Sequence, residues 1–223
     1  MEKSGKITRD ELIKKYGIDV AQLEQEQLKL AKELVIKNKI DFKLADKFGG
    51  FDNTFIGNKI LSCVIVCDKD FEIIDRAYAL EKIKFPYLPE FRNYRELEAM
   101  MIAFEKLTER PDVVLIPGQG ISHLRLGLAS HFSLATGVPS IGVANVVLDC
   151  EIKGEGILKE GKEIGNTLVE KEGSRPMYVS PGNLIDVKTA YEVSKSLIKP
   201  PHKRPEPLHL VAKYAKQVRK ELA

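Results

Sequence analysis

Cysteine and long hydrophobic runs are both scarce in this sequence. The three cysteines, Cys63, Cys67 and Cys150, form no C-x-x-C pair, so neither a disulfide framework nor a zinc knuckle is expected. No apolar run approaches the roughly 18 residues that a membrane span needs, and the charged start, MEKSGKITRDEL, differs from a signal peptide. We therefore expect a cytoplasmic protein in a reducing compartment, with no membrane partner.

A strong excess of one charge is also missing. The chain has 35 Lys and Arg against 32 Asp and Glu, a net charge of +3, which excludes a histone-like polycation but permits a local basic face. The stretch from Lys195 to Ala223 carries eight Lys and Arg against two Glu. It is either a surface that contacts the phosphates of a nucleic-acid backbone or a solvated basic helix face. Only Tyr214 is available there to stack on a base.

The commonest catalytic motifs are absent. The sequence has no G-x-x-x-x-G-K-[ST], H-E-x-x-H, G-x-S-x-G or dinucleotide fingerprint, which excludes the usual nucleotide-binding, metalloprotease and hydrolase classes. What the chain does have is 223 residues, of which 43% are hydrophobic, enough for a sizeable core.

The order of the expected elements indicates an α/β fold. An amphipathic helix, with Asp19 at its N-cap, precedes three stretches between Phe48 and Glu81 that predict successive antiparallel strands. Helices and buried strands then alternate: a helix after Pro89, the strand DVVLIP, a helix around residues 124–135 and the strand SIGVANVVL. Residues 150–180 predict a β-hairpin region, YVSPGN ends another strand, and residues 187–198 and 208–222 predict two helices.

This order is that of a ribonuclease H-like fold. We expect a central mixed five-stranded sheet flanked by helices, with an extra β-hairpin near residues 150–180. We also expect a single domain over residues 1–223, with the N-terminal helical segment 1–45 packed on it.

Two acidic residues occupy special places. Asp52 lies inside an apolar strand between Phe51 and Phe55, and burying an unpaired carboxylate there is costly. Glu96 lies in the first turn of its helix, about 40° around from Met100 and hence at the edge of the buried face. Carboxylates that converge from a strand and a helix suit a magnesium site for phosphodiester hydrolysis. The alternative is that Asp52 caps a turn and Glu96 pairs with a nearby lysine or arginine.

Four ordered blocks resemble the endonuclease V family. They run from roughly residue 20 to residue 215 and are PYLPEFRNYRE, GQGISHLRLGLASH, VPSIGVAN and KRPEPLHLVAKY. The resemblance implies a ribonuclease H-like fold and nicking of DNA or RNA near inosine, dependent on Mg²⁺ with Mn²⁺ as a substitute. It also implies that the partner is single-stranded nucleic acid or a distorted duplex, and we favour a monomer.

The resemblance assigns roles to individual residues. Asp52 and Glu96 match the strand and helix metal ligands, and are the candidate catalytic residues. The wedge that separates strands beside a lesion is matched by Pro86, Tyr87, Leu88 and Pro89. The glycine loop and its surroundings, which would also contact nucleic acid, are matched by Gly118, Gly120 and His123, with Asp112 nearby. Asp112 could instead cap the strand entry, and His123 could be a satisfied helix-start histidine.

The sequence departs from the family pattern at four positions. Pro117 stands where the third carboxylate falls, Gln119 replaces the histidine of the glycine loop, Asn145 replaces a lysine, and Asn183 replaces a late histidine. These changes remove charge or metal affinity, while the wedge and the scaffold remain. The sequence therefore supports a protein that acts on or binds inosine-containing or distorted DNA or RNA, with weak phosphodiester hydrolysis. A catalytically inactive relative that binds nucleic acid, or a protein-interaction module, is the alternative.

Overall fold

A nine-stranded sheet organises residues 8–169 and 174–222, the part of the chain that the computed structural model describes. Its order is β3-β2-β1-β4-β5-β9-β8-β7-β6. The strands are β1 (Phe48–Ile56), β2 (Lys59–Cys67), β3 (Ile73–Lys82), β4 (Val113–Pro117), β5 (Ser140–Ala144), β6 (Glu151–Lys153), β7 (Gly156–Lys159), β8 (Lys162–Leu168) and β9 (Met177–Asn183). The helices are α1 (Arg9–Tyr16), α2 (Val20–Ala31), the 3-10 helix η1 (Pro89–Phe91), α3 (Arg92–Glu105), α4 (Leu128–Thr136), α5 (Val187–Ser196) and α6 (Glu206–Glu221).

The predicted five-stranded core is confirmed, and the sheet continues beyond it. Strands β3, β2 and β1 pair antiparallel, whereas β1, β4 and β5 pair parallel, which makes the sheet mixed. The predicted hairpin region supplies β6, β7 and β8, which join the same sheet through β9. Residues 170–173 of this region lie outside the described part of the chain.

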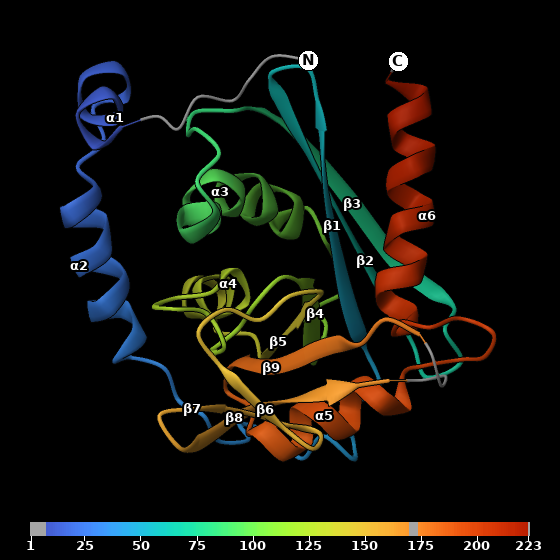
Figure 1. Ribbon diagram of the computed structural model, residues 1–223. Coiled ribbons are helices and arrows are strands. Elements are labelled where there is room, and N and C mark those ends of the chain that lie inside the picture. Colours follow the sequence, from blue (N-terminus) through green and yellow to red (C-terminus); the bar gives the residue numbers. More distant parts are fainter. Residues whose placement is uncertain (1–7, 170–173, 223) are drawn as a thin grey trace.

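Helices cover the two faces of the sheet (Figure 1). On one face, α3 and α4 cover a core that contains Phe51 and Val64. On the other face, α5 and α6 cover a core that contains Cys63 and Leu115. Alternate residues of β1 and β2 therefore enter different cores, as the two-residue period of a strand requires.

The N-terminal helices lie beside α3 and α4 (Figure 1). The Asp19 side chain accepts hydrogen bonds from the amides of Ala21 and Gln22, which confirms the predicted N-cap of α2. The apolar pattern continues to Leu34, but α2 ends at Ala31, because the following segment pairs with the end of β9 through the Val35 amide. The single-domain organisation stays a prediction, and residues 1–7 of the N-terminal segment are not described.

Helix α4 begins four residues later than the sequence pattern indicates. The segment before it is an irregular loop that ends at Gly127, the N-cap of α4. A Cβ atom on Gly127 would lie 2.1 Å from the Gln119 carbonyl oxygen, so the loop folds back on itself too closely for any other residue. This loop and the end of β4 form one wall of the candidate site.

Candidate functional site

The acidic residues lie beside the end of β4. Strands β1 and β4 run parallel with Gly50 opposite Leu115, so Asp52 lies at the level of Pro117, the last residue of β4. Glu96 comes from the first half of α3, which packs over β2 and β3. Three elements that are distant in sequence, β1, β4 and α3, thus meet just beyond the last paired residues of β1 and β4.

Glu96 is almost completely buried and its carboxylate is held by two neighbours. Its residue is only 2% exposed. Arg92 donates from Nε to Oε1 at 2.5 Å and from Nη2 to Oε2 at 2.9 Å. Asn53 donates from Nδ2 to Oε2 at 2.8 Å. The alternative interpretation of Glu96, an ion pair with a nearby arginine, is what the structure contains.

The same guanidinium reaches the end of β4. Arg92 Nη1 donates to the Pro117 carbonyl oxygen at 2.8 Å. A Cβ atom on Gly118 would lie 3.0 Å from Arg92 Nη1, and Gly118 has a φ of +147°, which L side chains rarely adopt. Gly118, predicted to contact nucleic acid, therefore also makes room for the guanidinium.

Asp52 approaches from the other side of β1. It pairs with Cys63, which belongs to the core under α6, whereas its neighbour Asn53 reaches Glu96 under α3. Adjacent strand residues point to opposite faces, so Asn53 and not Asp52 bonds Glu96. The charges of Arg92 and Glu96 nevertheless act on Asp52, and the meeting of the two carboxylates stays a prediction. Burial raises the pKa of Asp52, while the charges of Arg204 and Arg92 act against this and that of Glu96 adds to it.

The donor set does not fit the predicted Mg²⁺ or Mn²⁺. Among the described residues, no three His, Cys, Asp or Glu side chains gather to hold a metal ion. Glu96 already binds a cationic side chain and an amide, and Pro117 offers only its carbonyl oxygen, which Arg92 occupies. A divalent ion of this kind needs several oxygen ligands, and of the predicted set only the Asp52 carboxylate is left, because Glu96 and the Pro117 carbonyl oxygen are engaged.

The P-Y-L-P segment projects beside this site. Pro86 is buried, Leu88 is half-buried, and Tyr87 is 64% exposed. Pro89 begins η1, and the Phe91 amide donates to the Leu88 carbonyl oxygen at 3.0 Å. Tyr87 is therefore not part of the core.

A buried polar network clamps this segment to α2. Gln27 is fully buried and donates through Nε2 to the Glu90 carbonyl oxygen at 3.0 Å and to Asn93 Oδ1 at 3.2 Å. Arg125 donates to Gln27 Oε1 at 2.7 Å and to Glu90 Oε2 at 2.9 Å. No local sequence pattern indicates this network, because its members are spread over about 100 positions of the chain.

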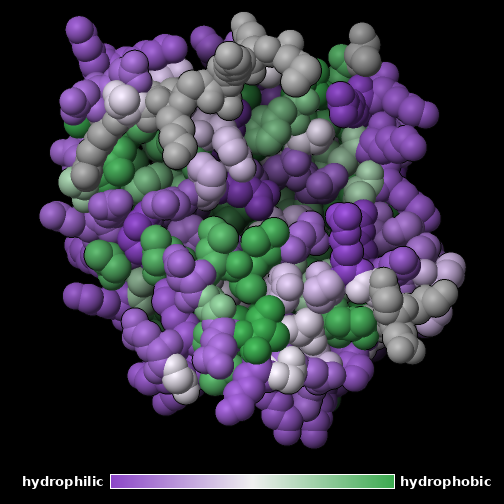
Figure 2. Space-filling model, in the orientation of Figure 1, coloured by the Kyte–Doolittle hydropathy of each residue, from purple (hydrophilic) through white to green (hydrophobic). Residues whose placement is uncertain are grey.

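A cavity of about 540 Å³ lies between the segment, α3 and the ends of β4 and β5. Tyr87 and Pro89 form one side, and Pro117, Gly118, Gln119, His123 and Asn145 contribute to the rest. Its rim includes the exposed hydrophobic side chains of Val146 and Leu148. Figure 2 shows hydrophobic side chains gathered over the region of α4, β4 and β5, surrounded by hydrophilic ones.

His123 is a buried acceptor at this cavity. Its Nδ1 accepts a hydrogen bond from the Arg125 amide at 3.1 Å. Burial, together with the nearby charge of Arg125, lowers the pKa of His123 to about 4. The imidazole is therefore neutral at physiological pH, in agreement with the interpretation of a satisfied histidine.

Three other sequence-predicted residues have structural roles away from the cavity. Gly120 is buried, and a Cβ atom on it would lie 2.1 Å from the Pro181 carbonyl oxygen. Asn183 pairs with Ser140, at the end of β5 opposite the cavity, and its Oδ1 accepts from the Val35 amide at 2.7 Å. The grouping of Asn183 with the active-site positions is thus wrong. Asp112, just before β4, accepts from the amides of residues 46 and 47, just before β1, so it joins the entries of the two strands and has a structural role.

The basic tail forms α6 and the segment before it. Lys213, Lys216 and Arg219 are exposed on α6, which packs on β1 and β2. Tyr214 packs against the core, with the Arg76 guanidinium 5.1 Å from its ring centroid. Tyr214 is therefore not free to stack on a base.

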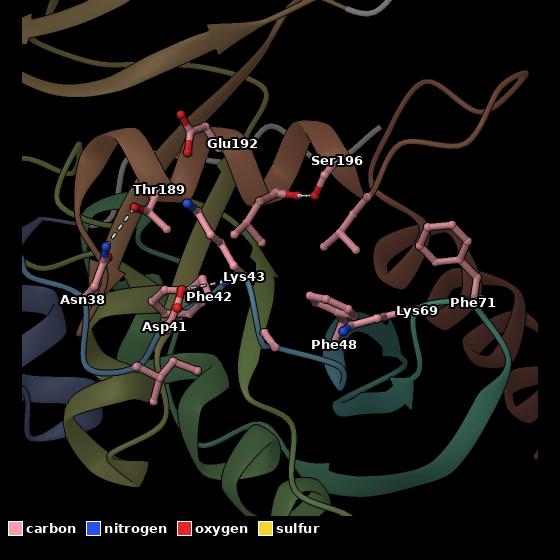
Figure 3. Close-up of a pocket in the computed structure, with 14 residues that line it drawn as sticks. Asn38, Asp41, Phe42, Lys43, Phe48, Lys69, Phe71, Thr189, Glu192 and Ser196 are labelled. Carbon is pink, nitrogen blue, oxygen red and sulfur yellow. Dashed lines mark hydrogen bonds between the residues drawn. The ribbon is translucent and has the colours of Figure 1, made fainter.

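A second cavity, of about 490 Å³, lies near α5. Figure 3 shows Phe42, Phe48 and Phe71 around it, with Lys43 and Lys69 beside them. None of the candidate site residues lines this cavity. The cavity beside Tyr87 is therefore the candidate functional site.

The chain is similar to endonuclease V proteins over most of its length. The sequence profile described as Endonuclease V matches residues 28–213. The chain is 34% identical over 203 residues to endonuclease V of Dictyoglomus turgidum. The aligned region covers 86% of this chain and 87% of that protein. It is 29% identical over 212 residues to endonuclease V of Archaeoglobus fulgidus, covering 92% and 96% of the two chains.

Solved structures share the fold. The structure of endonuclease V from Bacillus subtilis has a TM-score of 0.82 at 25% identity and covers 93% of this chain and 95% of that one. Ciona intestinalis endonuclease V, solved with a 24mer DNA that contains an inosine followed by a ribo-adenosine, has a TM-score of 0.80 at 20% identity and covers 92% and 99%.

Proposed function

The chain belongs to the endonuclease V family, and from this premise we propose that it binds DNA or RNA in which a base, inosine in particular, is displaced from the stack, and cleaves phosphodiester bonds weakly. The observation that carries the proposal is the exposed Tyr87 on a clamped segment beside a cavity of about 540 Å³. The Ciona relative was solved with inosine-containing DNA, which supports inosine as the base.

The segment is suited to fill the gap that a displaced base leaves. Two prolines and the bonds of Gln27 to the neighbouring backbone restrict it, so Tyr87 loses little conformational freedom on contact. Stacking of an aromatic side chain on an exposed base contributes roughly 1–3 kcal/mol. Displacing a base costs a few kcal/mol, and least where pairing is already weak, which favours lesions and mismatches over intact duplex.

The cavity has the size and lining of a base-binding site. Its volume falls in the range of small-ligand pockets, roughly 300–1,000 Å³, and its wall combines apolar side chains with the amides of Gln119 and Asn145. Amide groups can donate to and accept from the edge of a displaced base. The residues that replace a histidine and a lysine of the family thus remain useful for binding.

Weak hydrolysis follows from the acidic site. Pro117 provides no carboxylate, and Arg92 and Asn53 bind Glu96. Asn145 lacks the positive charge that could stabilise a transition state. Since each 1.4 kcal/mol lost is about tenfold in rate, the combined losses slow cleavage by orders of magnitude.

Phosphate contacts supplement the cavity in this proposal. The exposed cations of α6, among them Lys216 and Arg219, provide a salt-sensitive and sequence-independent part of the affinity. We further infer a monomer that acts in the cytoplasm. The free thiols of Cys63 and Cys67, both buried, are in keeping with a reducing compartment.

Substitution of Tyr87 tests the proposal. Tyr87→Ala should weaken binding to an inosine-containing duplex about tenfold while affinity for the intact duplex changes little, because only the displaced base exposes a stacking surface. Tyr87→Phe should retain most of the preference. Tyr16→Ala, at another exposed tyrosine on α1, is the matched control and should behave as wild type. Affinities are measured by fluorescence anisotropy on duplexes that differ at one base.

Two results would contradict the proposal. One is a wild-type protein that binds both duplexes equally. The other is a Tyr87→Ala variant that keeps the wild-type preference for inosine.

A further inference from the structure

The acidic site contains a cation supplied by the chain itself. The Arg92 guanidinium donates to both carboxylate oxygens of Glu96 and to the Pro117 carbonyl oxygen. It therefore bridges α3 and the end of β4 with three hydrogen bonds. The family resemblance assigns two of the metal-ligand positions to Glu96 and Pro117.

Helix stability alone does not explain an arginine at this place. Arg92 is the first residue of α3, where the helix dipole disfavours a cation. The pair also has the less favourable order, with the basic residue four positions before the acidic one. The ion pair with the buried Glu96 and the bond to Pro117 offset both effects.

The surroundings are complementary to the guanidinium. Gly118, which has no Cβ, leaves the space that Nη1 occupies, and Asn53 satisfies a further site on Oε2 of Glu96. Because Glu96 is buried, an unpaired carboxylate there would be costly, and Arg92 neutralises it. The charges of Arg92 and Arg204 also act on Asp52.

We propose that Arg92 is the resident cation of this site and replaces the divalent ion, so that a phosphate can approach the two carboxylates without a metal. A phosphate next to two uncompensated carboxylates would be repelled. The Arg92 side chain is 35% exposed and borders the cavity beside Tyr87. A guanidinium has five N–H donors, so the three bonds within the protein leave capacity for a phosphate oxygen.

The test measures metal binding by the protein alone. In wild type, millimolar Mn²⁺ should leave the melting temperature equal to that in EDTA, and titration should show no site tighter than about 1 mM. Arg92→Leu, which uncovers Glu96, should gain Mn²⁺ binding at least about tenfold tighter than wild type. Adding Glu96→Gln should remove that gain. Arg92→Gln serves as a second variant, because its amide can still donate one bond to Glu96.

The control is Arg110→Leu. Arg110 also bonds a carbonyl oxygen and covers an aromatic ring, both of Phe104, but it lies outside the acidic site. It should show the wild-type response to Mn²⁺. The inference is overturned if wild type binds Mn²⁺ below millimolar concentration in a manner that Glu96→Gln abolishes. It is equally overturned if neither Arg92 variant gains any metal binding.

Nucleic-acid binding gives a second readout, which rests on the proposed function. Wild type should bind the inosine-containing duplex equally in EDTA and in Mn²⁺. Arg92→Leu should lose about tenfold in affinity in EDTA and regain it in Mn²⁺. If wild type fails to bind the duplex at all, the proposed function fails, while the Mn²⁺ titrations of the protein alone still decide the role of Arg92.

Discussion

Burial converts His123 into a neutral hydrogen-bond acceptor, and the same effect links this residue to stability. Its pKa is lowered to about 4 from 6.5. Between these values the unfolded chain binds the proton and the folded chain does not, so the free energy of unfolding decreases as the pH falls from 6.5 towards 4. The contribution is up to about 3 kcal/mol, at 1.36 kcal/mol per pKa unit.

His123→Asn should reduce this pH dependence. The asparagine oxygen can still accept from the Arg125 amide, but it does not titrate. Urea unfolding of wild type and variant at neutral pH and near pH 4.5 measures the difference. A residual slope is expected in both proteins, because burial also lowers the pKa of His131. Identical slopes would contradict the account.

The sequence reveals individual residues unevenly. Asp19 as a cap could be predicted because capping is local. The exposed Tyr87 agrees with a prediction that came from the family resemblance. Arg92 had a local signal, since it lies four positions before Glu96 on a helix, but its bond to Pro117 depends on tertiary structure. The position of Asn183 away from the site could not be predicted for the same reason, because it depends on the register of β5 and β9.

At the scale of elements, α2 determines the position of the P-Y-L-P segment. Gln27 joins α2 to the Glu90 backbone and to Asn93 on α3, and Arg125 joins the same group from the loop before α4. Every contact is made by a buried or half-buried side chain. The segment therefore depends on a helix about 60 residues earlier in the chain.

Gln27→Leu should weaken this clamp. It leaves buried polar groups of Asn93 and Arg125 short of a partner, which costs roughly 1–3 kcal/mol of unfolding free energy. Hydrogen exchange of the Phe91 amide, which bonds to Leu88, should become faster than in wild type. Gln25→Leu, at an exposed position of the same helix, is the control and should change neither value. Protection of the Phe91 amide that is unchanged in Gln27→Leu would refute the clamp.

Elements with a strong local period could be predicted from the sequence, and those set by distant contacts could not. Strands β1, β2 and β3 alternate or are apolar throughout, and their connections carry turn residues, so they follow from the pattern. The start of α4 and the end of α2 depend on Gly127 and Asn183, which contact other parts of the chain. The hairpin strands could likewise be predicted from their local pattern. Their addition to the central sheet could not, because it depends on the pairing of β8 with the distant β9.

The whole molecule combines a retained recognition surface with an altered acidic site. The cavity, Tyr87 and the α2 clamp lie on one side of the opening at β4, and the Arg92–Glu96 pair closes the metal position beside it. Within the described residues, no helix is long and apolar enough to cross a membrane. We therefore expect this chain to bind selectively without metal-dependent cleavage, two properties that a nuclease of this family would combine.

The most direct test is to measure both properties on the same samples of wild-type protein. Duplexes with and without a single inosine are incubated with protein in EDTA, Mg²⁺ or Mn²⁺, and anisotropy and strand nicking are followed together. We expect the protein to bind the inosine duplex at least about tenfold more tightly than the duplex without inosine under all three conditions. We also expect only slow strand nicking of the bound duplex. Efficient Mg²⁺-dependent nicking, or binding that requires the metal, would contradict the account.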